Sequence, residues 1–150
     1  LDAFEAFFPE RRPFFVEGSG TFRFNMDCND GNCTGLFYSR RIGRAPQGSP
    51  DEGDDEFSTM PATATIIGAA KLAGRMGKFS VGGLTAVTAQ EEALIAGNEG
   101  IDQRTQGVAP LTPYSVARAR REYANQSALG WAGTAVGTAR SAVLPAPSWP

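Results

Sequence analysis

The chain has 150 residues, enough for one ordinary domain, and carries 14 basic and 16 acidic side chains for a net charge of −2. That balance gives no electrostatic case for nucleic acid or an anionic membrane surface as a partner. The sequence contains no histidine, which excludes triads with an imidazole base and histidine-rich zinc sites within this chain. Its 18 glycines and 10 prolines, set among short apolar runs, favour β structure with many turns.

Residues 1–60 form an aromatic-rich segment in which prolines limit helix formation. Residues 2–8 suit a short helical turn, and Pro9 and Pro13 prevent a long helix after it. The chain begins at Leu1 rather than at a methionine, so we expect it to be a fragment of a longer protein. No signal peptide is visible, and no run approaches the ~18 apolar residues of a transmembrane helix.

Two short strands and a long loop are predicted in the rest of this segment. Residues 21–25 alternate between apolar and polar side chains, as a short strand does, and residues 36–40 are a second strand candidate. Residues 43–59 are polar and contain several prolines and glycines, so we expect a loop there. Its acidic run at 51–56 lacks the ordered ligand spacing of an EF-hand, so we predict a solvated loop, with no metal site and no cofactor.

The clearest hairpin prediction covers residues 65–88. Residues 65–73 form the first strand, residues 74–78 the turn and residues 79–88 the returning strand. One face of the first strand carries Ile66, Gly68, Ala70 and Leu72. Two strands of about 9–10 residues with a tight turn match a hairpin of a membrane barrel. Small residues on both faces are unusual for the core of a soluble β-sandwich, which prefers larger side chains.

A second hairpin is predicted after a polar loop over residues 89–112. Its strands are residues 114–123 and 127–136, joined by a turn at 124–126. Three charged side chains share one face of the strand at 114–123: Arg118, Arg120 and Glu122. Such a face is typical of a polar lumen beside an apolar exterior, and equally of an ordinary antiparallel strand that faces solvent.

The two cysteines, Cys28 and Cys33, flank the run Asn-Asp-Gly-Asn, which turns easily. A local disulfide that closes a small loop is geometrically reasonable and would suit an oxidising compartment. Two free thiols are the alternative reading. A metal site with only two thiolates and no histidine is less favoured than either, so we predict a disulfide between Cys28 and Cys33.

Carboxylates are the first candidate catalytic groups, because the chain lacks histidine. Glu10 and Glu17 could supply the pair of carboxylates that glycoside hydrolysis needs. These residues also flank Arg11 and Arg12, so ion pairs and turn hydrogen bonds are the structural alternative. The sequence favours the structural alternative.

Arginines are the candidate ligand-binding groups. Arg40, Arg41 and Arg44 could bind phosphate or sugar-acid groups through bidentate hydrogen bonds. The alternative is a structural network with Glu10 or Glu17 inside a polar lumen, and we favour that alternative.

Several dispersed blocks give the chain a family resemblance. The blocks are residues 4–18 (FEAFFPERRPFFVEG), 36–47 (LFYSRRIGRAPQ) and 65–72 (TIIGAAKL). In this order they resemble a bacterial family described as domain of unknown function 5916. The resemblance implies an outer-membrane β-barrel joined to an N-terminal module similar to family 9 carbohydrate-binding modules. Relatives are often labelled as hydrolases, but the family offers no established catalytic residues to carry over.

The elements and the resemblance together predict an all-β fold, an antiparallel meander of hairpins that forms part of an outer-membrane-type β-barrel. We assign residues 1–138 to one barrel domain, with hairpins over 63–138, and residues 139–150 to an irregular tail. The expected location is the outer membrane of a Gram-negative-type bacterium, where the partners would be lipid and a glycan bound through the upstream module. The expected function is carbohydrate binding or uptake. A carbohydrate-active hydrolase and a structural barrel segment without activity are the alternatives.

Overall fold

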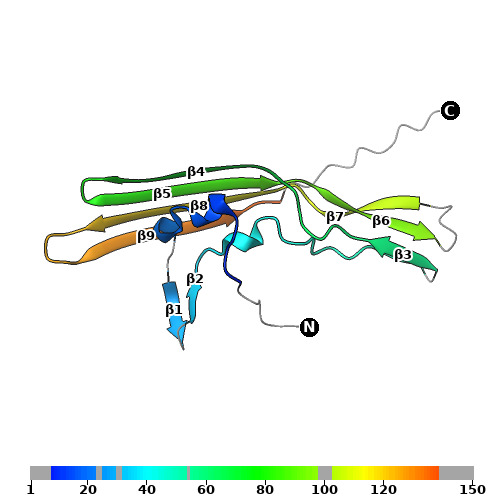
Figure 1. Ribbon diagram of the computed structural model, residues 1–150, viewed down its shortest axis with the longest axis horizontal. Helices are drawn as coiled ribbons and strands as arrows, with labels where there is room; N and C mark the ends of the chain where they lie inside the picture. Colours follow the sequence, from blue (N-terminus) through cyan, green and yellow to red (C-terminus); the bar gives the residue numbers. More distant parts are fainter. Residues whose placement is uncertain (1–7, 23–24, 30–31, 54, 98–102, 139–150) are drawn as a thin grey trace.

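The computed structural model describes residues 8–22, 25–29, 32–53, 55–97 and 103–138 as an all-β fold (Figure 1). Three short helical turns are α1 (Pro13–Val16), η1 (Ser19–Phe22) and η2 (Ser39–Arg41). The strands are β1 (Asn25–Asn29), β2 (Asn32–Gly35), β3 (Glu56–Thr59), β4 (Ile66–Met76), β5 (Phe79–Thr88), β6 (Glu91–Gly97), β7 (Gln103–Ala109), β8 (Thr112–Glu122) and β9 (Ala128–Val136). In the part of the chain that the structure describes, no helix is long and apolar enough to cross a membrane.

Among the described residues, the strand pairs are all antiparallel and form three open sheets. The largest has the order β4-β5-β8-β9, a second has the order β3-β6-β7, and β1 pairs with β2 alone. The described strands form the predicted antiparallel hairpins, but they do not close into a barrel. Strands β4 and β9 are therefore the edges of the largest sheet.

The two larger sheets lie end to end, as Figure 1 shows. Only residues 89–90 separate β5 from β6, and only residues 110–111 separate β7 from β8. Each of these strand pairs therefore continues from one sheet into the other. Short turns close the opposite end of the four-stranded sheet: Gly77 and Lys78 join β4 to β5, and residues 123–127 join β8 to β9.

The four-stranded sheet has one charged face and one apolar face. The strand register shows which residues belong to each, because residues directly opposite each other on paired strands share a face. On the charged face, Lys71 lies opposite Leu84, and Gly82 lies opposite Arg118. Arg120 and Glu122 continue this face along β8, by the alternation of a strand. This result confirms the predicted face of Arg118, Arg120 and Glu122.

The N-terminal segment, residues 8–44, covers the charged face and forms the core there. Figure 1 shows α1, η1 and η2 lying across the sheet, while β1 and β2 extend away from it. The buried cluster combines three residues of this segment with three of the sheet: Phe15, Phe22, Ile42, Leu84, Ala86 and Val116. Ile42 is 1% exposed and Leu84 is 4% exposed. Apolar burial of this kind is the main term that holds the segment on the sheet.

Two of the predicted N-terminal strands are wrong. Residues 21 and 22 of the first, predicted over 21–25, belong to η1, which places Phe22 in the core; β1 begins only at Asn25. In the second, Ser39 and Arg40 lie in η2, and the Ser39 carbonyl accepts bonds from the Ile42 amide and the Arg12 side chain rather than from a neighbouring strand. Both segments follow the surface of the sheet, and this tertiary packing overrides local alternation. The predicted helical turn at 2–8 falls almost wholly outside the described residues, as does the tail at 139–150.

The predicted loop at 89–112 is also wrong, because it contains β6 and β7. Ala93 and Ile95 of β6 are fully buried, although two glutamates, Glu91 and Glu92, begin the strand. The segment that precedes β3 covers this sheet: the Gly48 amide donates to the Val108 carbonyl at 3.1 Å. A Cβ at Gly48 would lie 2.5 Å from that carbonyl oxygen, so the close approach requires glycine. The predicted loop at 43–59 likewise ends in β3.

The first hairpin is confirmed, with two differences. Strand β4 runs to Met76, so the turn is only Gly77 and Lys78 rather than residues 74–78; Gly77 has φ +58°. The register shifts between Ile66 and Gly68, and Ile66 packs against the buried cluster instead of sharing a face with Gly68 and Leu72. Strands β8 and β9 match their predictions to within two residues.

Candidate functional site

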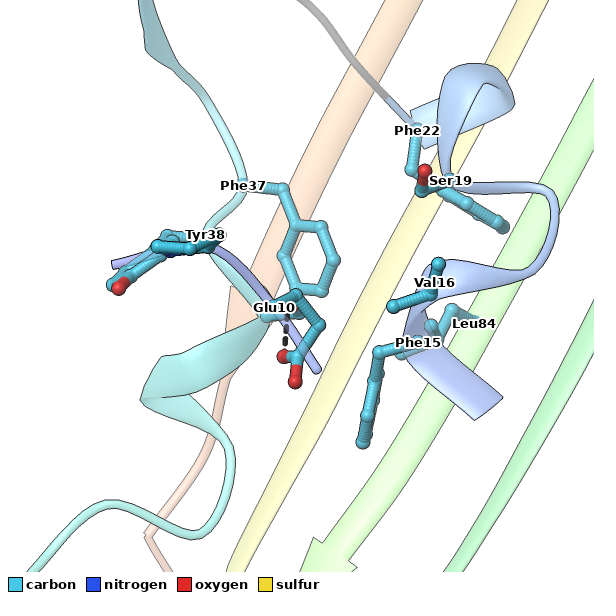
Figure 2. Close-up of a pocket in the computed structure, with 10 residues that line it drawn as sticks. Glu10, Phe15, Val16, Ser19, Phe22, Phe37, Tyr38 and Leu84 are labelled. Atoms are coloured by element: carbon cyan, nitrogen blue, oxygen red, sulfur yellow. Dashed lines mark hydrogen bonds between the residues drawn. The ribbon is translucent and has the colours of Figure 1, made fainter. Parts of the chain in front are cut away.

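A pocket of about 270 Å³ lies between the N-terminal segment and the four-stranded sheet. Figure 2 shows Phe15, Phe22 and Leu84 on one side of it, and Glu10, Phe37 and Tyr38 on the other. Most of the described residues that line the pocket are apolar, and Glu10 is the charged residue among them.

Glu10 is saturated with hydrogen-bond donors. Its carboxylate accepts bonds from Arg12 Nη2 at 2.7 Å, from Arg12 Nε at 2.9 Å and from Ser39 Oγ at 2.6 Å, the dashed line in Figure 2. The backbone amides of Arg11 and Arg12 donate as well, each at 3.0 Å. The side-chain bonds from Arg12, more than any other cause, lower the pKa of Glu10 to about 2. A general acid needs a raised pKa, so this environment favours a structural anion.

Arg12 is the hub of this network, and it connects two segments that lie far apart in the sequence. Besides Glu10, its guanidinium donates to the Ile42 carbonyl at 2.7 Å and to the Ser39 carbonyl at 2.9 Å. Its Cζ atom lies 4.3 Å from the centroid of the Phe15 ring, a cation–π contact. Arg12 therefore fixes η2 against α1. The short spacing of Glu10 and Arg12 in the sequence indicated their ion pair but not the bonds of Arg12 to η2.

Two cations of the sheet hold the N-terminal segment from the other side. Lys71 Nζ donates to the carbonyls of Phe14 and Glu17, which surround the end of α1. Arg118 Nη1 donates to the carbonyl of Thr21 at 2.9 Å. The charged face of the sheet is thus used to bind the backbone of the N-terminal segment.

Among the described contacts, none joins the other predicted site residues to the Glu10 carboxylate. Glu17 is exposed and contributes its carbonyl to Lys71. Arg40 donates to the Pro9 carbonyl at 3.0 Å and stacks on Phe8, with Cζ 5.6 Å from the ring centroid. Arg12, rather than the predicted arginines 40, 41 or 44, forms the ion pair with Glu10.

The acidic run before β3 is partly paired with β7. Arg104 Nη2 forms an ion pair with Glu56 at 2.7 Å, and Gln106 Nε2 donates to the Asp51 carboxylate at 3.2 Å. The hydrogen bond from Arg104 lowers the pKa of Glu56. Within the described ranges, no group of three or more histidine, cysteine, aspartate or glutamate residues is placed to hold a metal ion.

The pairing of β1 with β2 places Cys28 directly opposite Cys33. Opposite residues of an antiparallel pair have Cα atoms about 4.5–5.5 Å apart, within the range that a disulfide spans. We therefore expect a disulfide in protein exported to an oxidising compartment. Its intact mass without reduction should be lower by two hydrogens, and Cys28→Ser should abolish that difference. Free-thiol labelling of both cysteines in the exported protein would contradict the expectation.

These observations define an all-β protein in which an aromatic N-terminal segment is bound to the charged face of an antiparallel sheet. The family described as "Domain of unknown function (DUF5916)" matches residues 1–143. Because the match covers nearly the whole chain, the protein belongs to this family. No curated protein and no solved structure shows a significant match to the chain.

Proposed function

We propose that the chain is a segment of an outer-membrane β-barrel protein that takes part in carbohydrate binding or uptake at a Gram-negative-type envelope. The observation that carries the membrane part is the apolar face of the four-stranded sheet. Large side chains there are mostly exposed: Leu72 is 75%, Met76 76%, Leu129 68% and Trp131 61% exposed. A contiguous exposed apolar face of this kind marks an interaction surface, and lipid is one occupant it fits.

Strand length supports lipid as the occupant. Strands β4, β5, β8 and β9 have 11, 10, 11 and 9 residues. A tilted strand needs about 9–11 residues to cross the hydrocarbon core. The described strands therefore match one crossing each.

The turn end of the sheet resembles a membrane interface. Phe79 and Trp131 lie near it on the apolar face, and Tyr123 follows directly after β8. Arg121 stacks on two of these rings, with Cζ 5.1 Å from the Phe79 centroid and 4.9 Å from the Tyr123 centroid. Aromatic girdles flank the apolar band of outer-membrane barrels, whose short turns are periplasmic. This arrangement gives the three-stranded sheet an extracellular position in our proposal.

In the same arrangement the charged face would line the lumen and the N-terminal segment would occupy it as a plug. Charged side chains inside a polar lumen are typical of such barrels. The carbohydrate part of the proposal rests on the likeness to family relatives that carry a sugar-binding module. The hydrolase alternative has less support, because the low pKa of Glu10 suits an ion pair better than a catalytic acid.

A detergent requirement tests the membrane part. We expect the 150-residue chain alone to aggregate in buffer, because the edge strands β4 and β9 are unpaired in the described structure and the apolar face is exposed. Size-exclusion chromatography and thermal unfolding, with and without detergent micelles, measure this. A monodisperse monomer with a cooperative transition in plain buffer would favour an autonomous soluble domain instead.

An arginine on the apolar face tests the same proposal at one residue. Leu72→Arg should destabilise the protein in lipid bilayers by about 2–4 kcal/mol, the cost of an arginine that faces lipid near the midplane. Leu94→Arg is the matched control, because Leu94 is exposed on the three-stranded sheet, outside the proposed membrane part. Equal and small effects of the two substitutions would mean that the apolar face does not meet lipid.

A further inference from the structure

A second hollow, of about 460 Å³, lies next to the Glu10 network and is lined by arginines. Arg11, Arg12, Arg40 and Arg44 contribute to its wall, together with residues of the connection between β3 and β4. Among the described residues that line it, Glu10 is the one carboxylate. Four arginines and one glutamate of the described part of the chain therefore line this hollow.

Two of these arginines are already committed to the protein itself. Arg12 binds Glu10 and the carbonyls of Ser39 and Ile42. Arg40 binds the Pro9 carbonyl. Glu10 neutralises the positive charge of Arg12, and the backbone carbonyls satisfy further hydrogen-bond donors of both arginines.

The other two arginines have surplus charge and free donors. Arg11 and Arg44 are exposed, and neither guanidinium forms a hydrogen bond or an ion pair with any residue in the described part of the chain. Their backbones are fixed, since the Arg11 amide donates to Glu10 and the Arg44 carbonyl accepts from Ala64. Two arginines that line one hollow on fixed backbone, with guanidinium groups that no described residue neutralises, are suited to bidentate bonds with a carboxylate or a phosphate.

We infer that this hollow binds the anionic group, carboxylate or phosphate, of a soluble saccharide, with Arg11 and Arg44 as the main donors. The anion site stands on the arginines alone, whereas the saccharide rests on the function proposed above. Gly43 and Thr63 line the hollow, which lies near the beginning of β4. This is the end of the four-stranded sheet opposite the Gly77 turn. In a barrel, this position is the extracellular mouth of the lumen, where such a ligand would arrive.

The test is a binding measurement by calorimetry on the full chain, in buffer or micelles, whichever keeps it monodisperse. The probes are inorganic phosphate, glucose 1-phosphate and glucuronate, with glucose as the neutral comparison. We expect saturable binding of the anions, weakened by salt, and no binding of glucose. The double variant Arg11→Gln/Arg44→Gln should lose about tenfold or more in affinity, because charge-assisted hydrogen bonds are lost.

Arg75→Gln is the matched control, since it removes the same type of charge from an exposed arginine that pairs with Glu122 far from the hollow. It should leave anion affinity unchanged. Absence of saturable anion binding, or an equal loss in Arg75→Gln, would overturn the inference. Binding of inorganic phosphate without preference for either sugar anion would support the anion site and count against the glycan function, so the two failures are distinguishable.

Discussion

Glu10→Gln is expected to lower the free energy of unfolding by about 2–3 kcal/mol at neutral pH. The substitution removes the negative charge that binds Arg12 and Ser39 while keeping the size of the side chain. Arg12 then loses its counterion and holds the carbonyls of Ser39 and Ile42 less firmly. Chemical denaturation, in micelles if the chain needs them, measures the change.

The pH dependence follows from the same carboxylate. Its pKa is about 2 in the folded protein and 4.5 as the ordinary value, so the folded state favours the ionised form. The stabilisation is fully present above about pH 5 and is lost as the pH falls towards 2. The wild-type protein and Glu10→Gln should therefore differ most at neutral pH and converge in acid.

Glu17→Gln is the matched control, because Glu17 is an exposed glutamate seven residues away whose described bond to Lys71 uses the backbone carbonyl. Its stability should change by less than about 0.5 kcal/mol, as is usual for surface substitutions. Equal effects of the two substitutions would contradict the structural role of Glu10. A loss of glycoside turnover in Glu10→Gln with unchanged stability would instead revive the hydrolase hypothesis.

Gly82→Val is expected to displace the N-terminal segment from the sheet. A Cβ at this position would lie 2.7 Å from Thr21 Cγ2 and 3.1 Å from Phe22 Cε1. Because Phe22 is buried, it cannot retreat without opening the cluster, and overpacking of this kind costs about 1–3 kcal/mol. Hydrogen exchange at residues 13–22 should become faster, while the β5–β8 pairing stays protected.

The adjacent glycine provides the control. Gly83 lies on the apolar face, and a Cβ there would meet no atom within 4 Å. Gly83→Val should leave exchange at residues 13–22 unchanged, although both substitutions add the same side chain to the same strand. Faster exchange in both variants would show that the effect comes from the strand rather than from contact with Phe22.

The hairpins of the four-stranded sheet could be predicted because their sequence alternates and their contacts are local. Arg118, Arg120 and Glu122 were assigned to one face by period alone, and the register agrees. The bulge at Ile66 could not be predicted, because it depends on the core into which that side chain turns.

The N-terminal segment and the Glu10 network were harder to predict because distant residues determine them. Arg12 binds carbonyls 27 and 30 residues away, and Arg118 binds one 97 residues away. Local alternation at 21–25 therefore predicted a strand where packing on Gly82 produces a helical turn. Strand β6 was missed for a related reason. Its two glutamates indicated a polar loop, but Ala93 and Ile95 are completely buried in the folded protein.

The binding of residues 8–44 to the charged face also constrains the order of folding. The surface beneath Phe15 and Phe22 is made by Leu84 and Val116, which lie opposite each other only when β5 has paired with β8. The hairpin contacts close short loops, whereas the contacts of the N-terminal segment close long ones and form at a greater entropic cost. We therefore expect residues 8–44, although they are synthesised before the sheet, to be among the last to reach their final position, and to need shielding of their phenylalanines until then.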